Sequence, residues 1–284
     1  MRKKTSKVKK NHHVALITFA VIVALILTLL WSSDCGTERL VGAYYYPWYV
    51  GGQWSSQSGQ VPVFGYYDSG NTTVIDQQLT WAKGCGIDFF VISTSLYENL
   101  SNVNLVFAEN ARLGNLIHLC AMAEPHSDSE FAELTNYVEN LTRYSSYLSW
   151  NGKPLLFVYT EYLNIPNLSS ALSDLFSSRF TEEFIPLEAP YFIPNVQTYE
   201  FSNVISVSPG QFTPNYVNRN NGQYYSNQWE TAIANAKVNP GRNMMVVITS
   251  WNEWYECTAI EPSTTWGGLY LQLTQQYAAQ FKKT

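Results

Sequence analysis

Two glutamates lie three residues apart in an aromatic segment near the end of the chain, TSWNEWYECTAIEPS (249–263). On a helical turn, Glu253 and Glu256 would have Cβ atoms about 5–6 Å apart. Two carboxyl groups that close repel each other as anions, so one should keep its proton to a higher pH, as a general acid requires. Cleavage of a glycosidic bond uses such a pair, because one group protonates the leaving oxygen while the other acts on the opposite side of the ring. The spacing therefore indicates catalytic roles for Glu253 and Glu256.

Aromatic, polar and carboxylate side chains also follow other apolar runs. The candidates for substrate binding are Tyr46, Trp48, Glu124, Ser208, Gly210, Trp251, Asn252 and Glu261. Rings beside carboxylates suit a sugar, since its C–H faces stack on rings and its hydroxyls need acceptors. Each candidate also has a structural reading: the YYYPWY cluster could be core, Glu124 could cap a helix, and Glu261 could begin one. The residues by themselves leave both readings open.

Short apolar runs alternate with longer amphipathic segments after residue 40. The runs that predict strands are 41–46, 87–93, 116–123, 154–160, 203–208 and 244–250, most of them apolar on both faces as in parallel sheets. The segments that predict helices are 74–86, 102–114, 129–144, 168–180, 225–237 and 268–282. This alternation predicts an α/β fold, and a length of about 250 residues suits a single (β/α)8 TIM-like barrel. Two more strands are then expected in the weaker pattern around 184–199.

The barrel prediction also places the candidate site. In such barrels the chemistry lies at the carboxyl ends of the strands. Tyr46, Ser93, Glu124 and Trp251 each lie at or just after the end of a predicted strand. We therefore expect them to open on one end of the barrel and to line a common cleft.

The first 31 residues differ from the rest. Residues 1–13 contain six basic residues and no acidic one, and residues 14–31 form an uncharged apolar run of 18 residues. As a helix this run would cover about 27 Å, enough for a bilayer core. We interpret 1–13 as a cytoplasmic tail, 14–31 as a transmembrane signal anchor, 32–40 as a stalk, and 41–284 as an extracellular or lumenal catalytic domain. A cleaved signal peptide is the alternative, although its apolar region would more often span about 7–15 residues.

Charge and cysteine content limit the partners. Six of the 17 basic residues precede Val14 and none of the 22 acidic residues do, so the remainder has 11 basic and 22 acidic residues. This excess of negative charge argues against nucleic acid as a partner. Cys35, Cys85, Cys120 and Cys257 are not spaced like a metal site. They could form disulfides in any of three pairings or remain buried thiols.

Four segments resemble a known family. ITSWNEWYECTAIEPS is similar to the signature of glycoside hydrolase family 99 and its polysaccharide-locus relatives, the endo-α-mannosidase group, in which Asn-Glu-Trp-x-Glu-Gly is followed by a further Glu. YYYPWYVGGQW, AKGCGIDFFVIS and SVSPG resemble the first strand, the second strand and a later loop of that family. The four segments follow the family order. Tyr255 departs from the His common in the mannosidases, and Cys257 departs from the usual Gly.

The resemblance implies a (β/α)8 barrel and endo-acting, retaining cleavage of α-mannosides without a metal or organic cofactor. It implies that Glu253 acts as a base on the sugar 2-hydroxyl, giving a 1,2-anhydro sugar, and that Glu256 acts first as acid and then as base. Tyr46, Trp48 and the 208–210 loop would line the sugar subsite, and Glu124 matches a family carboxylate. The departures at Tyr255 and Cys257 favour a changed substrate. A membrane-anchored barrel that binds glycans without cutting them and a hydrolase of another surface polysaccharide are the alternatives.

Overall fold

The computed structural model describes residues 37–56, 59–97, 100–159, 179–185, 204–212 and 216–284. The chain divides into two units, Met1–Glu38 and Arg39–Thr284, and all elements below belong to the second. The predicted tail, anchor and most of the stalk lie outside the described residues. The first strand begins at Arg39, two residues inside the segment expected to be stalk. Within the described ranges, no helix has the length and apolar character needed to cross a bilayer.

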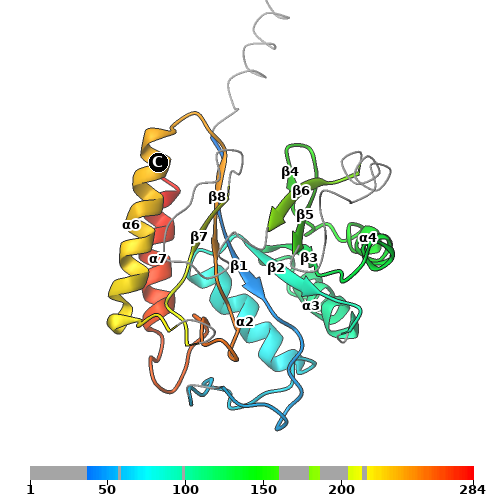
Figure 1. Ribbon diagram of the computed structural model, residues 1–284, viewed down its shortest axis with the longest axis horizontal. Helices are drawn as coiled ribbons and strands as arrows, with labels where there is room; N and C mark the ends of the chain where they lie inside the picture. The colour runs from blue at the N-terminus through cyan, green and yellow to red at the C-terminus, as the bar shows by residue number, and fades with distance from the viewer. Residues whose placement is uncertain (1–36, 57–58, 98–99, 160–178, 186–203, 213–215) are drawn as a thin grey trace, which may run out of the picture. The chain divides into compact units, whose positions relative to one another are not determined.

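The centre of the second unit is a parallel sheet (Figure 1). Its strands are β1 (Arg39–Tyr45), β2 (Phe89–Thr94), β3 (His118–Ala123), β5 (Lys153–Tyr159), β6 (Thr181–Ile185), β7 (Val204–Val207) and β8 (Met244–Ile248), with β4 (Ser149–Trp150) antiparallel to β5. The parallel strands lie in the order β6-β5-β3-β2-β1-β8-β7. The last strand therefore pairs with the first, with Val41 opposite Val246. An open doubly wound sheet would not return to its first strand in this way, so the circular order is that of a curled, barrel-like sheet.

Helices follow the same circular order. They are α2 (Thr72–Gly84), α3 (Leu100–Arg112), α4 (Asp128–Leu141), α6 (Gln223–Val238) and α7 (Leu269–Phe281), with a short 3₁₀ turn, η2 (Asn220–Gly222), before α6. Helix α3 packs on α2, α2 on α7, and α7 on α6. The chain thus alternates strands inside with helices outside, which is the α/β class predicted from the sequence.

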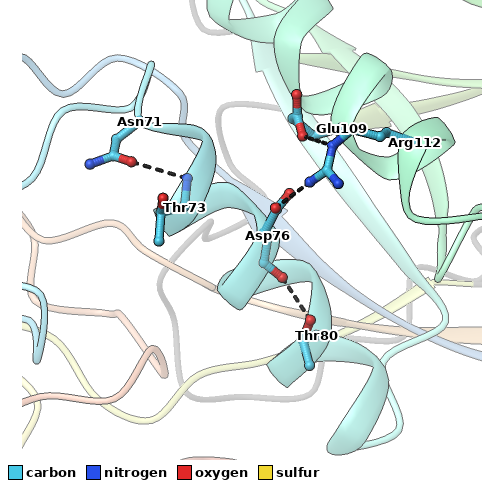
Figure 2. Close-up of polar contacts among 6 residues, drawn as sticks. All are labelled: Asn71, Thr73, Asp76, Thr80, Glu109 and Arg112. Carbon is cyan, nitrogen blue, oxygen red and sulfur yellow. Dashed lines mark hydrogen bonds and ion pairs between the residues drawn. The ribbon is translucent and has the colours of Figure 1, made fainter.

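Local signals explain where two helices begin. The Asn71 side chain accepts a hydrogen bond from the backbone N–H of Thr73 and caps α2 (Figure 2). Further along α2, Asp76 pairs with Arg112 of α3, so the two neighbouring helices are joined by an ion pair at the surface. Ser127 caps α4 by accepting from the N–H of Glu130. The pattern Ser-x-x-Glu is a common helix start, because both ends satisfy backbone donors that lack a helical partner.

The core combines strand side chains with the buried faces of the helices, such as Phe107 of α3 and Trp229 of α6. Every residue of β2 and β8 is buried, as expected for strands covered on both faces. Cys85, Cys120 and Cys257 are buried free thiols, so the disulfide alternative does not hold among these three. Most of the helix predicted at 168–180 and most of the 184–199 segment lie outside the described residues. Strand β6 lies in the weak region but begins at Thr181, earlier than expected.

Candidate active site

The loop after β8 carries the glutamates and folds compactly on itself. Ser250 N–H donates to the carbonyl of Thr258 at 3.0 Å, and Glu261 N–H donates to the carbonyl of Trp251 at 2.9 Å. The Ser250 hydroxyl accepts from Glu253 N–H at 2.7 Å. These contacts fix the backbone on both sides of the glutamates, so the loop is a preorganised support for them.

Glu253 is almost completely buried. Its Oε1 accepts backbone N–H bonds from Tyr255 at 2.8 Å and Glu256 at 3.3 Å. Burial, followed by the negative charges of Glu256 and Glu124, raises its pKa to about 8. The spacing predicts that one glutamate of the pair has a raised pKa and acts as the general acid. In the structure the raised pKa belongs to Glu253, to which the resemblance gives the role of base. Burial is the main cause, and spacing cannot reveal burial.

Glu124 lies on the same end of the sheet. It follows β3 directly, and Ser93 at the end of β2 donates its hydroxyl to Glu124 Oε1 at 2.6 Å. Its negative charge contributes to the raised pKa of Glu253, which requires the two carboxyls to be near each other. The expectation that the β2, β3 and β8 ends face a common region therefore agrees with the structure.

Asn252 joins the first strand to the last. Its Oδ1 accepts from Tyr46 N–H at 2.8 Å, and its Nδ2 donates to the Tyr46 carbonyl at 3.0 Å. The Tyr49 hydroxyl donates to the carbonyl of Asn252 at 2.7 Å and accepts from Trp254 N–H at 2.9 Å. Asn252 was predicted to bind substrate, yet its amide is occupied by the backbone of the β1 loop. It positions Tyr46 beside the glutamates.

Several aromatic rings lie near the contact between Asn252 and Tyr46. Tyr46 and Trp48 lie with ring centroids 4.5 Å apart, and Trp48 remains half-buried. Tyr255 is 39% exposed, and its ring lies 5.5 Å from that of Tyr49. Trp48 and Tyr255 keep accessible ring surface on which a sugar could stack, whereas Tyr46, predicted to contact substrate, is buried in the core. Trp251 differs, because it is fully buried and packs on Phe90 at 5.2 Å.

The 208–210 loop is held mainly by protein contacts. Ser208 N–H donates to Gln228 Oε1 at 2.8 Å, and the Ser208 hydroxyl accepts from Gly210 N–H at 3.3 Å. Gly210 has φ of 129°, and a Cβ there would lie 2.7 Å from Arg219 Cγ. The loop shape thus requires glycine, whatever its role towards substrate. Cys257 also has a positive φ of 59°, a backbone conformation that glycine adopts more readily than other residues.

Glu261 is a second buried carboxylate, and it has a different environment. It accepts hydrogen bonds from the Tyr67 hydroxyl at 2.8 Å, Gln78 Nε2 at 2.6 Å and Trp254 Nε1 at 2.9 Å. Burial raises its pKa to about 7, although these three donors oppose the rise. All three partners belong to the protein, so the arrangement favours a structural role over substrate contact.

A stability measurement tests this role. The folded-state pKa of Glu261 lies above its ordinary value of 4.5, so the folded state binds more protons and stability falls as pH rises from about 4.5 past 7. At about 1.4 kcal/mol per pKa unit, the loss from Glu261 is roughly 3 kcal/mol. Glu261→Gln cannot ionise, so its melting temperature should fall less between pH 5 and pH 8.5, with kcat still measurable. The exposed control Glu133→Gln should keep the wild-type slope. An unchanged slope together with lost kcat would instead place Glu261 on the substrate.

The structure also shows an aromatic contact that sequence reasoning missed. Tyr97, 68% exposed after β2, stacks on His126 with centroids 4.6 Å apart and donates its hydroxyl to Glu130 at 3.0 Å. An exposed ring fixed in this way, beyond the strand ends that carry Ser93 and Glu124, is suited to stack on a sugar. Tyr97 follows β2, whereas His126 and Glu130 lie at the start of α4, so no sequence pattern marks the cluster. Within the described ranges, no group of three His, Cys, Asp or Glu side chains could hold a metal ion.

Comparisons with known proteins support the fold. A family model described as Glycosyltransferase WbsX matches residues 210–274, which include Glu253 and Glu256. The fold is similar to that of the GH99 endo-α-mannosidase from Bacteroides thetaiotaomicron in complex with bis-tris propane, with a TM-score of 0.68 and 19% identity over 86% of this chain and 97% of that chain. A second structure of a GH99 endo-α-mannosidase from that organism gives a TM-score of 0.64 and 18% identity over the same shares of both chains. A glycoside hydrolase-like protein gives 0.60 and 15% identity over 86% of this chain and 95% of that chain. No curated protein matches.

Proposed function

We propose that this chain, which is GH99-like in fold, is a retaining, endo-acting glycoside hydrolase that cleaves α-mannoside-type linkages in a glycan or polysaccharide. The observation that carries the proposal is that Glu256 and Glu124 lie close enough to Glu253 at the strand ends for their negative charges to raise its pKa. Half-buried and exposed rings lie next to them, including Trp48 and Tyr255. Carboxyl groups beside aromatic faces are what sugar binding and glycosidic cleavage require.

In the proposed mechanism Glu253 removes the proton of the sugar 2-hydroxyl, and that oxygen then attacks the anomeric carbon. Glu256 protonates the leaving oxygen and later activates the water that opens the 1,2-anhydro sugar. The raised pKa of Glu253 makes its ionised form a stronger base. The two N–H donors on Oε1 hold the carboxylate in place during proton transfer.

The proposal extends to parts of the chain outside the described residues. We expect the curled sheet to close as a single (β/α)8 barrel, because the strand order is already circular. We also retain the expectation that residues 14–31 form a signal anchor with a cytoplasmic amino terminus and an external catalytic domain. The motivation is the charge asymmetry around the apolar run. Protease that removes the catalytic domain from sealed cells would support this topology, and its protection would refute it.

Glycosyl transfer is a second candidate function. It is favoured by the family model described as Glycosyltransferase WbsX, which spans both glutamates. The same carboxylates would serve, with a sugar hydroxyl replacing water as the acceptor. The sugar-binding barrel without catalysis remains the non-enzymatic alternative.

The deciding experiment incubates the full chain with α-1,2-, α-1,3- and α-1,6-linked mannans and follows product size and anomeric form by NMR. Shorter fragments with the α configuration at the new reducing end support the proposal. A matched substrate that lacks the 2-hydroxyl at the reacting sugar should not be cleaved, because it cannot form the anhydro intermediate. Its normal hydrolysis would show direct carboxylate attack. Products longer than the substrate would indicate transfer instead, and no turnover of any substrate would leave the binding alternative.

A further inference from the structure

The hydroxyl of Tyr49 makes two hydrogen bonds to the loop that carries Glu253. It donates to the carbonyl of Asn252 at 2.7 Å and accepts from the N–H of Trp254 at 2.9 Å. A hydroxyl has one donor and two acceptor positions, so one oxygen can make both bonds. The two backbone groups belong to the peptide units immediately before and after Glu253, and they lie 203 and 205 residues beyond Tyr49 in the chain.

These two bonds restrict the backbone at Glu253. Each peptide unit is a rigid plane, so the conformation of Glu253 depends on the rotation of two planes about its Cα atom. Ser250 Oγ and Thr258 N–H each hold one of these planes, at 2.7 and 3.1 Å, but both belong to the same loop and move with it. Tyr49 holds both planes and belongs to a different segment. Its hydroxyl therefore fixes the direction in which the side chain of Glu253 leaves the backbone.

Tyr49 is itself held firmly. Its N–H donates to Ser69 Oγ at 3.0 Å, and its carbonyl accepts from Ser69 N–H at 2.9 Å. Its ring lies 4.2 Å from the ring of Trp54 and is almost fully buried. Because both the backbone and the ring are fixed, the hydroxyl transmits the position of the segment after β1 to the loop after β8.

Tyr49 does not touch the reacting atoms. Only 1% of the residue is exposed, so a substrate does not reach it. Burial, followed by the negative charge of Glu253, raises the pKa of Tyr49 well above its ordinary value of 10, so the hydroxyl keeps its proton at any working pH. It therefore serves as a permanent donor and acceptor, not as an acid or a base. The effect of the Glu253 charge also shows that the hydroxyl lies near this carboxyl.

We infer that Tyr49 is a positioning residue for Glu253, because its hydroxyl holds both adjoining peptide units and so keeps the carboxyl aimed and enclosed. Asn252 and Trp254 are fully buried, so without the hydroxyl their carbonyl and N–H would lose this partner away from water. The loop would then shift to pair these groups again, and the carboxyl would turn towards water. The inference rests on the proposed hydrolase function, in which Glu253 is the base.

Tyr49→Phe tests the inference in the full chain, because it removes the hydroxyl and keeps the ring. On an aryl α-mannoside with a good leaving group, kcat should fall roughly tenfold or more, since a small displacement of a reacting group costs up to about 10²-fold. KM should change by less than about twofold, because Tyr49 does not reach the substrate. The rise of kcat/KM with pH should move roughly half a unit or more to lower pH, since hydration of Glu253 weakens the main cause of its raised pKa.

Tyr225→Phe is the matched control. The Tyr225 hydroxyl is also buried and bonds Thr274 Oγ1 at 2.8 Å, between α6 and α7. Both variants should lower the melting temperature, but Tyr225→Phe should leave kcat, KM and the pH profile at wild-type values. A lower melting temperature of Tyr49→Phe with unchanged kcat and pH profile would reduce Tyr49 to a structural residue. A raised KM with unchanged kcat would place it on the substrate instead, and either result would overturn the inference.

A second variant covers the case in which Tyr49→Phe does not fold. Ser69→Ala keeps the Tyr49 hydroxyl but removes the acceptor of the Tyr49 N–H. It should lower kcat roughly threefold or more and shift the pH profile in the same direction, because a loosened Tyr49 holds Glu253 less well. Wild-type kcat and pH profile in Ser69→Ala would refute the inference.

Carbon NMR separates this inference from the hydrolase proposal. If the wild type cleaves no substrate, the hydrolase proposal fails, and the pKa of Glu253 is then measured directly with 13C-labelled glutamate, its signal identified by its loss in Glu253→Gln. A pKa of Glu253 that is lower in Tyr49→Phe, or in Ser69→Ala if the former does not fold, and unchanged in Tyr225→Phe would still support positioning by Tyr49. Equal values in the wild type and that variant would refute it.

Discussion

Glu253→Gln should abolish turnover of natural glycans and of substrates with activated leaving groups alike. The 2-hydroxyl must lose its proton before it can attack, and no leaving group removes that need. General base help is typically worth about 10²–10⁴-fold, so kcat/KM should fall by at least that range on both substrates. Glutamine retains an oxygen that can accept the N–H bonds of Tyr255 and Glu256, so the loop should keep its shape. The exposed control Glu133→Gln should retain wild-type rates.

The pH profile gives the same prediction a second readout. The pKa of Glu253 is raised to about 8, so wild-type kcat/KM for the activated substrate should increase with pH until this carboxyl is ionised. The activated substrate needs no acid, so this rise is not masked by loss of the Glu256 proton. A variant that keeps cleaving the activated substrate but loses the natural one would show that Glu253 is the acid, and the two roles would then be exchanged.

Glu256→Gln should abolish cleavage of natural glycans yet retain cleavage of the activated substrate. Natural leaving oxygens must be protonated as the bond breaks, whereas a good leaving group departs as an anion. The loss on natural glycans should reach about 10²–10⁴-fold. The activated substrate should still react to the anhydro intermediate, which then opens slowly because the same residue activates the water. Pre-steady-state release of the leaving group should therefore show a burst.

Two results would contradict the assignment of Glu256. Equal loss on both substrates would mean that it does more than protonate the leaving group. Full activity on natural glycans would remove it from the mechanism, and Glu124 would become the next candidate because its charge also acts on Glu253. Full activity in both glutamine variants would leave only glycan binding.

The sequence by itself predicted the regular elements well. The runs at 87–93, 116–123 and 244–250 correspond to β2, β3 and β8, because strands buried on both faces must be apolar throughout. Gly86 and Gly114 are the last residues of two predicted helical segments and have φ of 85° and 82°, as glycines at helix ends should. The pairing of the glutamates with aromatic residues was also visible, because it is local in the chain.

Tertiary structure alone decided which candidates face a ligand. Asn252 binds the backbone of Tyr46, 206 residues away, and Trp251 is buried against Phe90. The identity of a polar or aromatic residue does not reveal such partners. Its hydrogen-bonding groups and its surface can be occupied by segments that are distant in the sequence. For the same reason, no sequence pattern predicted that the rings of Tyr97 and His126 stack on each other.

The raised pKa of Glu253 distinguishes most clearly what the sequence determined from what the tertiary structure decided. Residue type and spacing established that two carboxyl groups lie close together and that one of them should hold its proton. Which one holds it depends on burial first and on the charges of Glu256 and Glu124 second. Burial is a property of the packed chain, since water is removed from a carboxyl only when other segments of the fold pack around it. The sequence determined the chemical groups, and the tertiary structure determined their solvation and therefore their reactivity.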